Sequence, residues 1–81
     1  MVELDFGDAI RLLKAGKRVA RAGWNGKGMW LCAQVPDAHS KMTHPYFYIE
    51  YPDGHAAYPT GSRVPWLASQ TDMWATDWVE V

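Results

Sequence analysis

The sequence predicts an α+β fold in which an N-terminal helix packs on a small antiparallel β-sheet. Apolar residues recur at helical spacing in only one sizeable segment, which lies near the N-terminus. Short runs with the alternation or the aromatic and β-branched content of strands follow it, and hairpin-type turns separate them. With 81 residues and neither a linker nor a repeat, the chain is expected to form a single domain over residues 1–81.

The expected helix runs from Asp5 to Gly16. Asp5 is the predicted N-cap, and Asp8, three residues later, completes a capping box with a shorter acid than the usual glutamate. Gly16 is expected to end the helix as the residue after the C-cap, where glycine is favoured. The apolar residues fall on one stripe, which is predicted to face the core, and they are Phe6, Ala9, Ile10 and Leu13.

Two strands are expected on either side of a glycine-rich turn. Alternating polar and apolar residues predict the first over Lys17–Arg21, and a nearly continuous apolar run predicts the second over Met29–Val35. Asn25-Gly26 is the dipeptide that a two-residue hairpin turn prefers. A continuous apolar strand is usually covered on both faces, and in so small a domain another subunit is the expected second cover.

A second hairpin is expected in the middle of the chain. Tyr46–Tyr51 has the composition of a strand, and Pro52-Asp53-Gly54 that of a turn, so His55–Tyr58 is predicted to be the returning strand. Ser69 and Asp72 form a second capping box. The remaining expectations are loops over Pro36–Pro45 and Pro59–Pro65, a helical turn from Ser69 to about Ala75, and a final strand over Asp77–Val81.

Composition excludes several classes of protein. A net charge of −1 argues against a DNA- or RNA-binding protein. One cysteine excludes an internal disulfide, and the three histidines lack the spacing of metal ligands, so neither a metal nor another cofactor is expected. No apolar run reaches the roughly 20 residues of a membrane span, and the charged start is unlike a signal peptide. A free thiol without such a signal fits the cytoplasm. Five tryptophans in a marginally sized domain favour oligomerisation.

The glycine-rich turn contains side chains that its geometry does not require. Arg21 and Lys27 supply positive charge, Trp24 a flat surface for stacking, and Asn25 a carboxamide, while the turn offers free backbone N–H groups. This combination suits a nucleotide. The alternative is a hairpin whose tryptophan packs on the core and whose lysine is only solvated. A P-loop NTPase is not expected, because Gly28 replaces the required hydroxyl residue and a strand follows.

A second cluster of hydrogen-bonding side chains lies at the start of the expected C-terminal helical turn. There, Ser69, Gln70, Thr71 and Asp72 surround backbone N–H groups that the helix leaves unpaired. In a functional interpretation, Trp66 lies opposite Trp24 and the two clamp a base, while Gln70 or Asp72 recognises its polar edge or a ribose hydroxyl. In the structural alternative, the segment is a capped turn beneath a core tryptophan.

Taken together, several motifs resemble one small phage and prophage family. They are Leu-Lys-Ala-Gly-Lys at the helix end, Val-Ala-Arg-Ala-Gly-Trp-Asn-Gly-Lys-Gly-Met, Val-Pro-Trp-Leu-Ala-Ser-Gln-Thr-Asp-Met, and the closing Asp-Trp. The best-understood members of the family, long filed as a domain of unknown function, are Thoeris anti-defence proteins of the second type. The resemblance implies a sponge that binds a cyclic ADP-ribose signal of a bacterial TIR enzyme and holds it intact. It also implies a homotetramer with ligand pockets between subunits, and cyclic di- or trinucleotides of CBASS defence as further ligands.

The resemblance also assigns site residues. The turn side of the pocket would be formed by Trp24, Asn25, Gly26 and Lys27, and the other side by Trp66, Ser69, Gln70 and Asp72. Arg21 joins them on the charge argument given above. No catalytic residue is expected. Two other functions stay open: an enzyme that degrades a cyclic nucleotide with Asp72 or a histidine as base, and a structural oligomer whose aromatic residues only build an interface.

Overall fold

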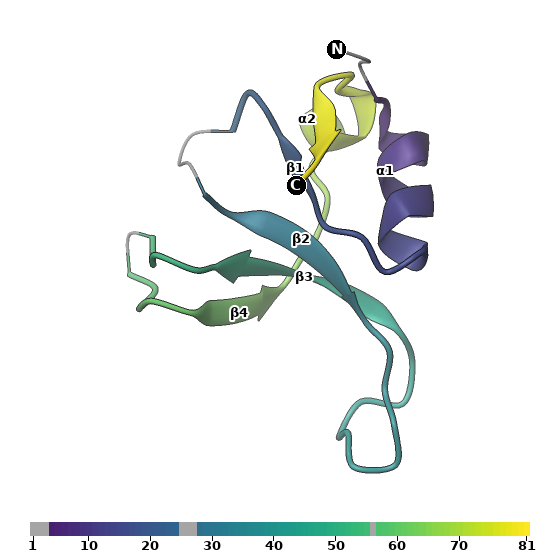
Figure 1. The fold of residues 1–81 in the computed structure, drawn as a ribbon, viewed down its shortest axis with the longest axis vertical. Coiled ribbons are helices and arrows are strands. Elements are labelled where there is room, and N and C mark those ends of the chain that lie inside the picture. The colour runs from purple at the N-terminus through teal and green to yellow at the C-terminus, as the bar shows by residue number, and fades with distance from the viewer. Residues whose placement is uncertain (1–3, 25–27, 56) are drawn as a thin grey trace.

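A computed structural model describes residues 4–24, 28–55 and 57–81 of the protein. In this part of the chain it shows one five-stranded antiparallel sheet and two helices (Figure 1). This confirms the predicted α+β class. In chain order the elements are α1 (Phe6–Lys14), β1 (Val19–Arg21), β2 (Trp30–Gln34), β3 (Tyr46–Tyr51), β4 (Ser62–Pro65), α2 (Gln70–Trp74) and β5 (Trp78–Glu80).

Helix α1 begins and ends where the sequence predicts. The backbone N–H of Asp8 donates to Asp5 Oδ1 over 2.8 Å, and the backbone N–H of Asp5 donates to Asp8 Oδ2 over 3.1 Å, so the capping box is confirmed. Gly16 has a φ of 86°, which an L side chain rarely adopts, and the chain turns away from the helix there. Ala9 and Leu13 of the predicted stripe are buried against the sheet.

The strand order is β4-β3-β2-β1-β5, so the last strand of the chain pairs with the first. Val19 lies opposite Glu80, and Arg21 lies opposite Trp78. The four other strands lie in reverse chain order from one edge of the sheet. This closing pair of strands, β1 and β5, places the residues around Asp77 beside Arg21, 56 positions earlier in the sequence.

The core lies on one face of the sheet. Val19, Leu31 and Ile49 follow one another across neighbouring strands and are buried under α1, together with Trp78. Both helices contact the core face, α1 through Ala9 and Leu13 and α2 through the backbone of Asp72 at Trp78. On the opposite face, which neither helix covers in this way, four residues are nevertheless half-buried: Trp30, Cys32, Tyr48 and Val79. The strand register places Gln34, Glu50 and Arg63 on the same face, so the face is mixed in character, and its cover by another subunit stays a prediction.

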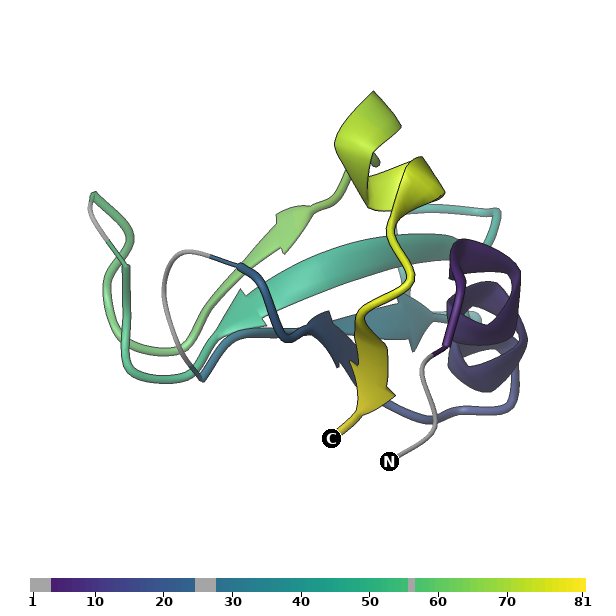
Figure 2. The ribbon, with the colours of Figure 1, turned by 90° about the horizontal axis from the view of Figure 1, so that it is seen from above.

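The described parts of the β1–β2 connection and of the β3–β4 hairpin lie at the same end of the sheet, away from α1 (Figure 2). Residues 22–29 join β1 to β2, a longer connection than a two-residue hairpin turn. The Asn25-Gly26 dipeptide itself lies outside the described residues.

The prediction that His55–Tyr58 is the returning strand is wrong. His55 and Tyr58 form only an isolated bridge with each other, and the strand that pairs with β3 is β4, inside the segment predicted to be a loop. The reason is that the backbone N–H groups of Gly54 and Gly61 both donate to the Tyr51 carbonyl, which closes the intervening residues into a loop. Pro65 is tolerated in β4 because this is an edge strand.

The two glycines of this loop give a test of its geometry. Both have a positive φ, 77° at Gly54 and 82° at Gly61, but only at Gly54 would a Cβ meet backbone, 2.9 Å from the Tyr58 carbonyl oxygen. We expect Gly61→Ala to lower the free energy of unfolding by about 1 kcal/mol through the left-handed backbone alone. Gly54→Ala is expected to lower it by about 2–3 kcal/mol, because the clash adds to the same strain. Chemical denaturation measures both, and equal losses would contradict the loop geometry.

Candidate functional site

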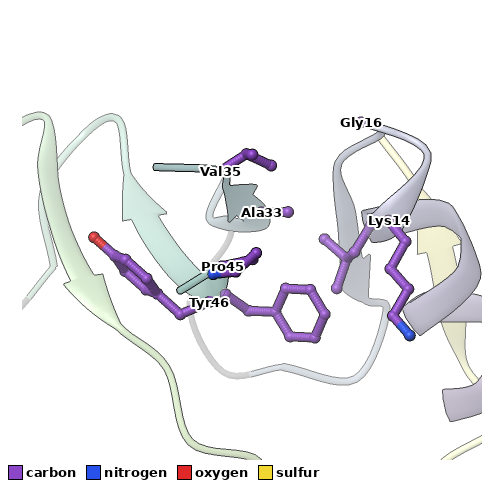
Figure 3. Close-up of a pocket in the computed structure, with 8 residues that line it drawn as sticks. Lys14, Gly16, Ala33, Val35, Pro45 and Tyr46 are labelled. Carbon is purple, nitrogen blue, oxygen red and sulfur yellow. The ribbon is translucent and has the colours of Figure 1, made fainter. Parts of the chain in front are cut away.

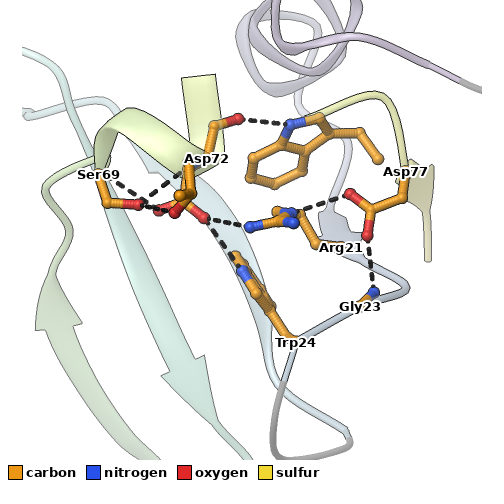
Figure 4. Close-up of polar contacts among 8 residues, drawn as sticks. Arg21, Gly23, Trp24, Ser69, Asp72 and Asp77 are labelled. Atoms are coloured by element: carbon orange, nitrogen blue, oxygen red, sulfur yellow. Dashed lines mark hydrogen bonds and ion pairs between the residues drawn. The ribbon is translucent and has the colours of Figure 1, made fainter. Parts of the chain in front are cut away.

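Arg21, at the end of β1, lies between two carboxylates from the C-terminal part of the chain. Its Nε donates to Asp77 Oδ1 over 2.8 Å, and its Nη1 donates to Asp72 Oδ1 over 2.9 Å (Figure 4). The other oxygen of Asp77 accepts the backbone N–H of Gly23 at 2.8 Å. The Arg21 side chain is only 19% exposed, so water screens these two ion pairs little. They hold together β1, the β1–β2 connection and the segment from α2 to β5.

Asp72 is the most highly connected polar residue of this site. Its backbone N–H donates to Ser69 Oγ over 3.1 Å and its Oδ2 accepts the backbone N–H of Ser69 over 3.0 Å, which confirms the predicted capping box of α2. Its Oδ1 accepts the Trp24 indole N–H at 3.3 Å in addition to Arg21. Asp72 is 8% exposed, and these bonds are what make the burial of a carboxylate tolerable.

The hydrogen bonds keep all three charged groups ionised. For Arg21, the hydrogen bond to Asp77 raises the pKa against the effect of burial, and Asp72 adds to it. The same bond to Arg21 lowers the pKa of Asp77. Burial acts to raise the pKa of Asp72, but hydrogen bonds from Ser69, Arg21 and Trp24 outweigh it and leave that pKa lowered.

The aromatic part of the site consists of the fully buried Trp78 and two tryptophans that contact it, Trp24 and Trp66. The Trp24 ring lies 5.5 Å from that of Trp78 at 80°, and the Trp66 ring lies 6.1 Å from it at 86°. The Trp78 indole N–H donates to the backbone carbonyl of Asp72 over 3.1 Å. Trp24 and Trp66, the two rings of the predicted clamp, are therefore both edge-on to one rigidly held indole.

The two clamp rings line different cavities in the single chain. Trp24 lines one of about 330 Å³ at the β1–β2 connection, together with Arg21 and Trp30. Trp66 lines another of about 420 Å³, together with His44 and Phe47. The two rings of the predicted clamp therefore line different cavities, and a base held between them stays a prediction.

The remaining predicted site residues divide into two groups. Ser69 makes the contacts of a helix cap, whereas Gln70 is exposed and its side chain makes no hydrogen bond to the described residues. Asn25, Gly26 and Lys27 lie outside the described part of the chain, so their role in the site stays a prediction.

Sequence reasoning missed two residues of the site. The sequence pattern places Asp77 at the start of the final strand and gives it no role in the site, yet Asp77 is one of the two carboxylates that bind Arg21. Trp78 was interpreted as part of a final strand, yet it supports both clamp rings. Only the resemblance to the family pointed to the closing Asp-Trp pair, because the local pattern of these two residues is that of any edge strand.

A larger cavity of about 600 Å³ lies away from this site, between the C-terminal end of α1 and the ends of β2 and β3 (Figure 3). Its lining is mostly apolar and includes Leu13, Val35 and Phe47, with Lys14 and Tyr46 as the residues that carry polar side-chain groups. Specific ligand sites generally combine apolar walls with several convergent polar groups, which this cavity lacks. Among residues 4–24, 28–55 and 57–81, no cluster of histidine, cysteine and acidic residues could hold a metal ion, and no helix is long and apolar enough to cross a membrane.

Comparison with known proteins identifies the family. Residues 4–81 match the family model of the Thoeris anti-defense 2-like domain. The chain belongs to this family. A relative from Bacillus phage SP01, named Thoeris anti-defense 2, is 34% identical over an alignment of 91 positions, gaps included, that covers 94% of this chain and 92% of the relative. The match extends over nearly all of this Thoeris anti-defense 2-like chain and confirms the resemblance that its motifs indicated.

The ion pairs of Arg21 predict that replacing Arg21 lowers the free energy of unfolding much more than replacing Arg63, another arginine of the sheet. Arg21→Met leaves Asp72 and Asp77 without their shared cation, and we expect the free energy of unfolding to fall by about 3 kcal/mol. Arg63→Met is the matched control, because Arg63 is 67% exposed and its one ion pair among the described residues is with Glu50, so its loss should cost less than about 1 kcal/mol. Urea unfolding of both variants would contradict the structure if the two losses were equal.

The lowered pKa values of Asp72 and Asp77 predict acid sensitivity. Their contribution to stability is present above the unfolded-state pKa of about 3.9 and is lost as the pH falls through the lower folded-state value. We expect the melting temperature to fall between pH 5 and pH 2 and to fall less steeply in Asp77→Asn. Asp8, whose pKa its hydrogen bonds also lower, contributes to the slope of both proteins. If the melting temperature depended on pH with the same slope in the native protein and in Asp77→Asn, Asp77 would not contribute to the acid sensitivity.

Proposed function

We propose that this protein is a phage-type anti-defence sponge. It binds a cyclic ADP-ribose immune signal, glycocyclic ADP-ribose in the first instance, and sequesters it without cleavage, so that the effector of the host is not activated. The observation that carries the proposal is the indole and carboxylate cluster around Trp78, present in a chain of the Thoeris anti-defense 2-like family. The name of the phage SP01 relative, Thoeris anti-defense 2, supports the anti-defence role.

The cluster suits tight binding because its stacking surface is held before the ligand arrives. Trp24 is fixed at its nitrogen by Asp72 and at its ring by Trp78. A ring that is already ordered loses little conformational entropy on binding, so more of the stacking energy appears as affinity. A sponge that acts at nanomolar signal concentrations needs about −12 kcal/mol of binding free energy.

The sponge is proposed to be a homo-oligomer, and the resemblance to the family implies that it is a tetramer. Support comes from Trp24 and Trp66, which line separate cavities within one chain. With Trp24 from one subunit and Trp66 from another, the ligand would be enclosed on both sides, and a site between subunits excludes water better than an open surface. Cyclic di- or trinucleotides are proposed as additional ligands, in pockets separate from this one.

Binding without catalysis is favoured by the state of the acidic residues. A general base works best when its pKa lies near the operating pH. The carboxylates of Asp72 and Asp77 are instead stabilised as anions by Arg21, which lowers the pKa of each and makes both weak bases. The alternative is an enzyme that degrades the signal, which would release a converted product, whereas a sponge releases the ligand intact.

The proposal predicts that glycocyclic ADP-ribose binds and is recovered unchanged. Calorimetric titration of the purified protein should give tight binding, and mass spectrometry after heat denaturation should identify the intact ligand. A converted product would establish the enzyme instead. Absence of binding would overturn the proposed ligand.

Trp24→Leu tests the role of stacking. It keeps apolar volume against Trp78 but removes the aromatic face, and we expect about 5- to 100-fold weaker binding. Trp74→Leu is the control, because Trp74 is 84% exposed and pairs with no aromatic ring in the described chain. If the oligomer dissociates while affinity per subunit is unchanged, the structural-oligomer function is favoured.

A further inference from the structure

A second tryptophan opens onto the Trp24 cavity. Trp30, the first residue of β2, lines the cavity of about 330 Å³ together with Trp24. Ala20 and Val79 lie opposite each other on β1 and β5 and form part of its apolar lining. Two indoles with a small apolar surface between strands form the kind of slot that a flat ring fills.

Arg18 adds a positive charge beside this slot. Its guanidinium carbon lies 4.4 Å from the centroid of the Trp30 ring, a cation–π contact. No ion pair joins Arg18 to a carboxylate in the described part of the chain, whereas Arg21 in the same lining is bonded to two. A guanidinium that lies against an aromatic ring keeps its N–H groups available at the edge, where they can bond an anion in a bidentate manner.

We infer that this cavity receives the base of a nucleotide, with Trp24 and Trp30 as its aromatic lining and Arg18 as the contact for the attached phosphate. The inference rests on the proposed function and deepens it, because it adds two binding residues that no motif indicated. All three side chains come from one chain. Trp66 of a neighbouring subunit would then cover the part of the ligand that remains outside the cavity.

The size of the cavity agrees with this assignment. Pockets for small molecules usually span about 300–1,000 Å³. At about 330 Å³ the Trp24 cavity is near the lower limit, so it has room for a base and an adjoining sugar but not for a whole cyclic dinucleotide. We expect the phosphate to lie outside the cavity, beside the exposed Arg18, whose guanidinium lies against the Trp30 ring.

The test compares Trp30→Leu and Arg18→Gln with the native protein in titrations with two probes, glycocyclic ADP-ribose and AMP. Loss of the Trp30 ring should weaken binding by about 5- to 100-fold. Loss of the guanidinium should weaken binding about tenfold. Trp74→Leu and Arg63→Gln remove the same groups elsewhere on the surface and should leave affinity unchanged.

Conservative variants separate binding from folding. Trp30→Phe keeps an aromatic face and should retain most of the affinity, whereas Arg18→Lys keeps the charge without the planar fork and should recover only part of it. Thermal unfolding of each variant shows whether the sheet remains intact. If Trp30→Leu does not fold, Trp30→Phe and Arg18→Gln decide the outcome.

The results distinguish this inference from the proposed function. If the native protein binds glycocyclic ADP-ribose and the Trp30 and Arg18 variants bind it equally well, the inference is overturned and the sponge stands. If AMP binds in a Trp30-dependent manner and the cyclic ligand does not bind, the cavity assignment stands and the proposed ligand fails. No binding of either probe overturns both.

Discussion

The position of Arg21 between Asp72 and Asp77 is the interaction on which the rest of the site depends. One guanidinium at the end of β1 bonds two carboxylates, one within α2 and one just before β5. Leaving the buried Asp72 or the half-buried Asp77 without a cation would carry a large desolvation penalty. The pairing therefore favours the arrangement in which β5 pairs with β1, and that arrangement places Trp78 against Trp24 and Trp66.

This network explains why a chain of only 81 residues can hold large aromatic side chains in fixed orientations. The apolar core under α1 is small, and α2 has just five residues, too few to be stable by itself. Its stability comes from its capping box and from the bonds of Asp72 to Arg21 and Trp24. The same groups that hold α2 in place also fix the stacking surface, so stability and binding are built from one set of contacts.

Particular residues show how far local patterns reach. Asp5 with Asp8, and Ser69 with Asp72, were recognisable as helix starts because each bond joins residues three positions apart. The run Tyr46–Tyr51 was recognisable by its composition. The position of β4 was not, because the turn signal at Pro52-Asp53-Gly54 favoured His55–Tyr58 as the returning strand, whereas the glycine hydrogen bonds to Tyr51 close that segment into a loop. Likewise, tryptophans could be named as candidates, but which cavity each one lines depends on the strands around it.

The sequence by itself determined the helix starts, most of the strands, the α+β class and the family. These follow from contacts within a few residues and from motifs that can be read along the chain. Only the tertiary structure decided that β5 pairs with β1, that Asp77 shares Arg21 with Asp72, and that Trp24 and Trp66 line separate cavities. The physical reason is that a contact between residues some 50 positions apart is set by strand order and register. Those are chosen by the burial and ion pairing of the whole chain, and no local pattern encodes them.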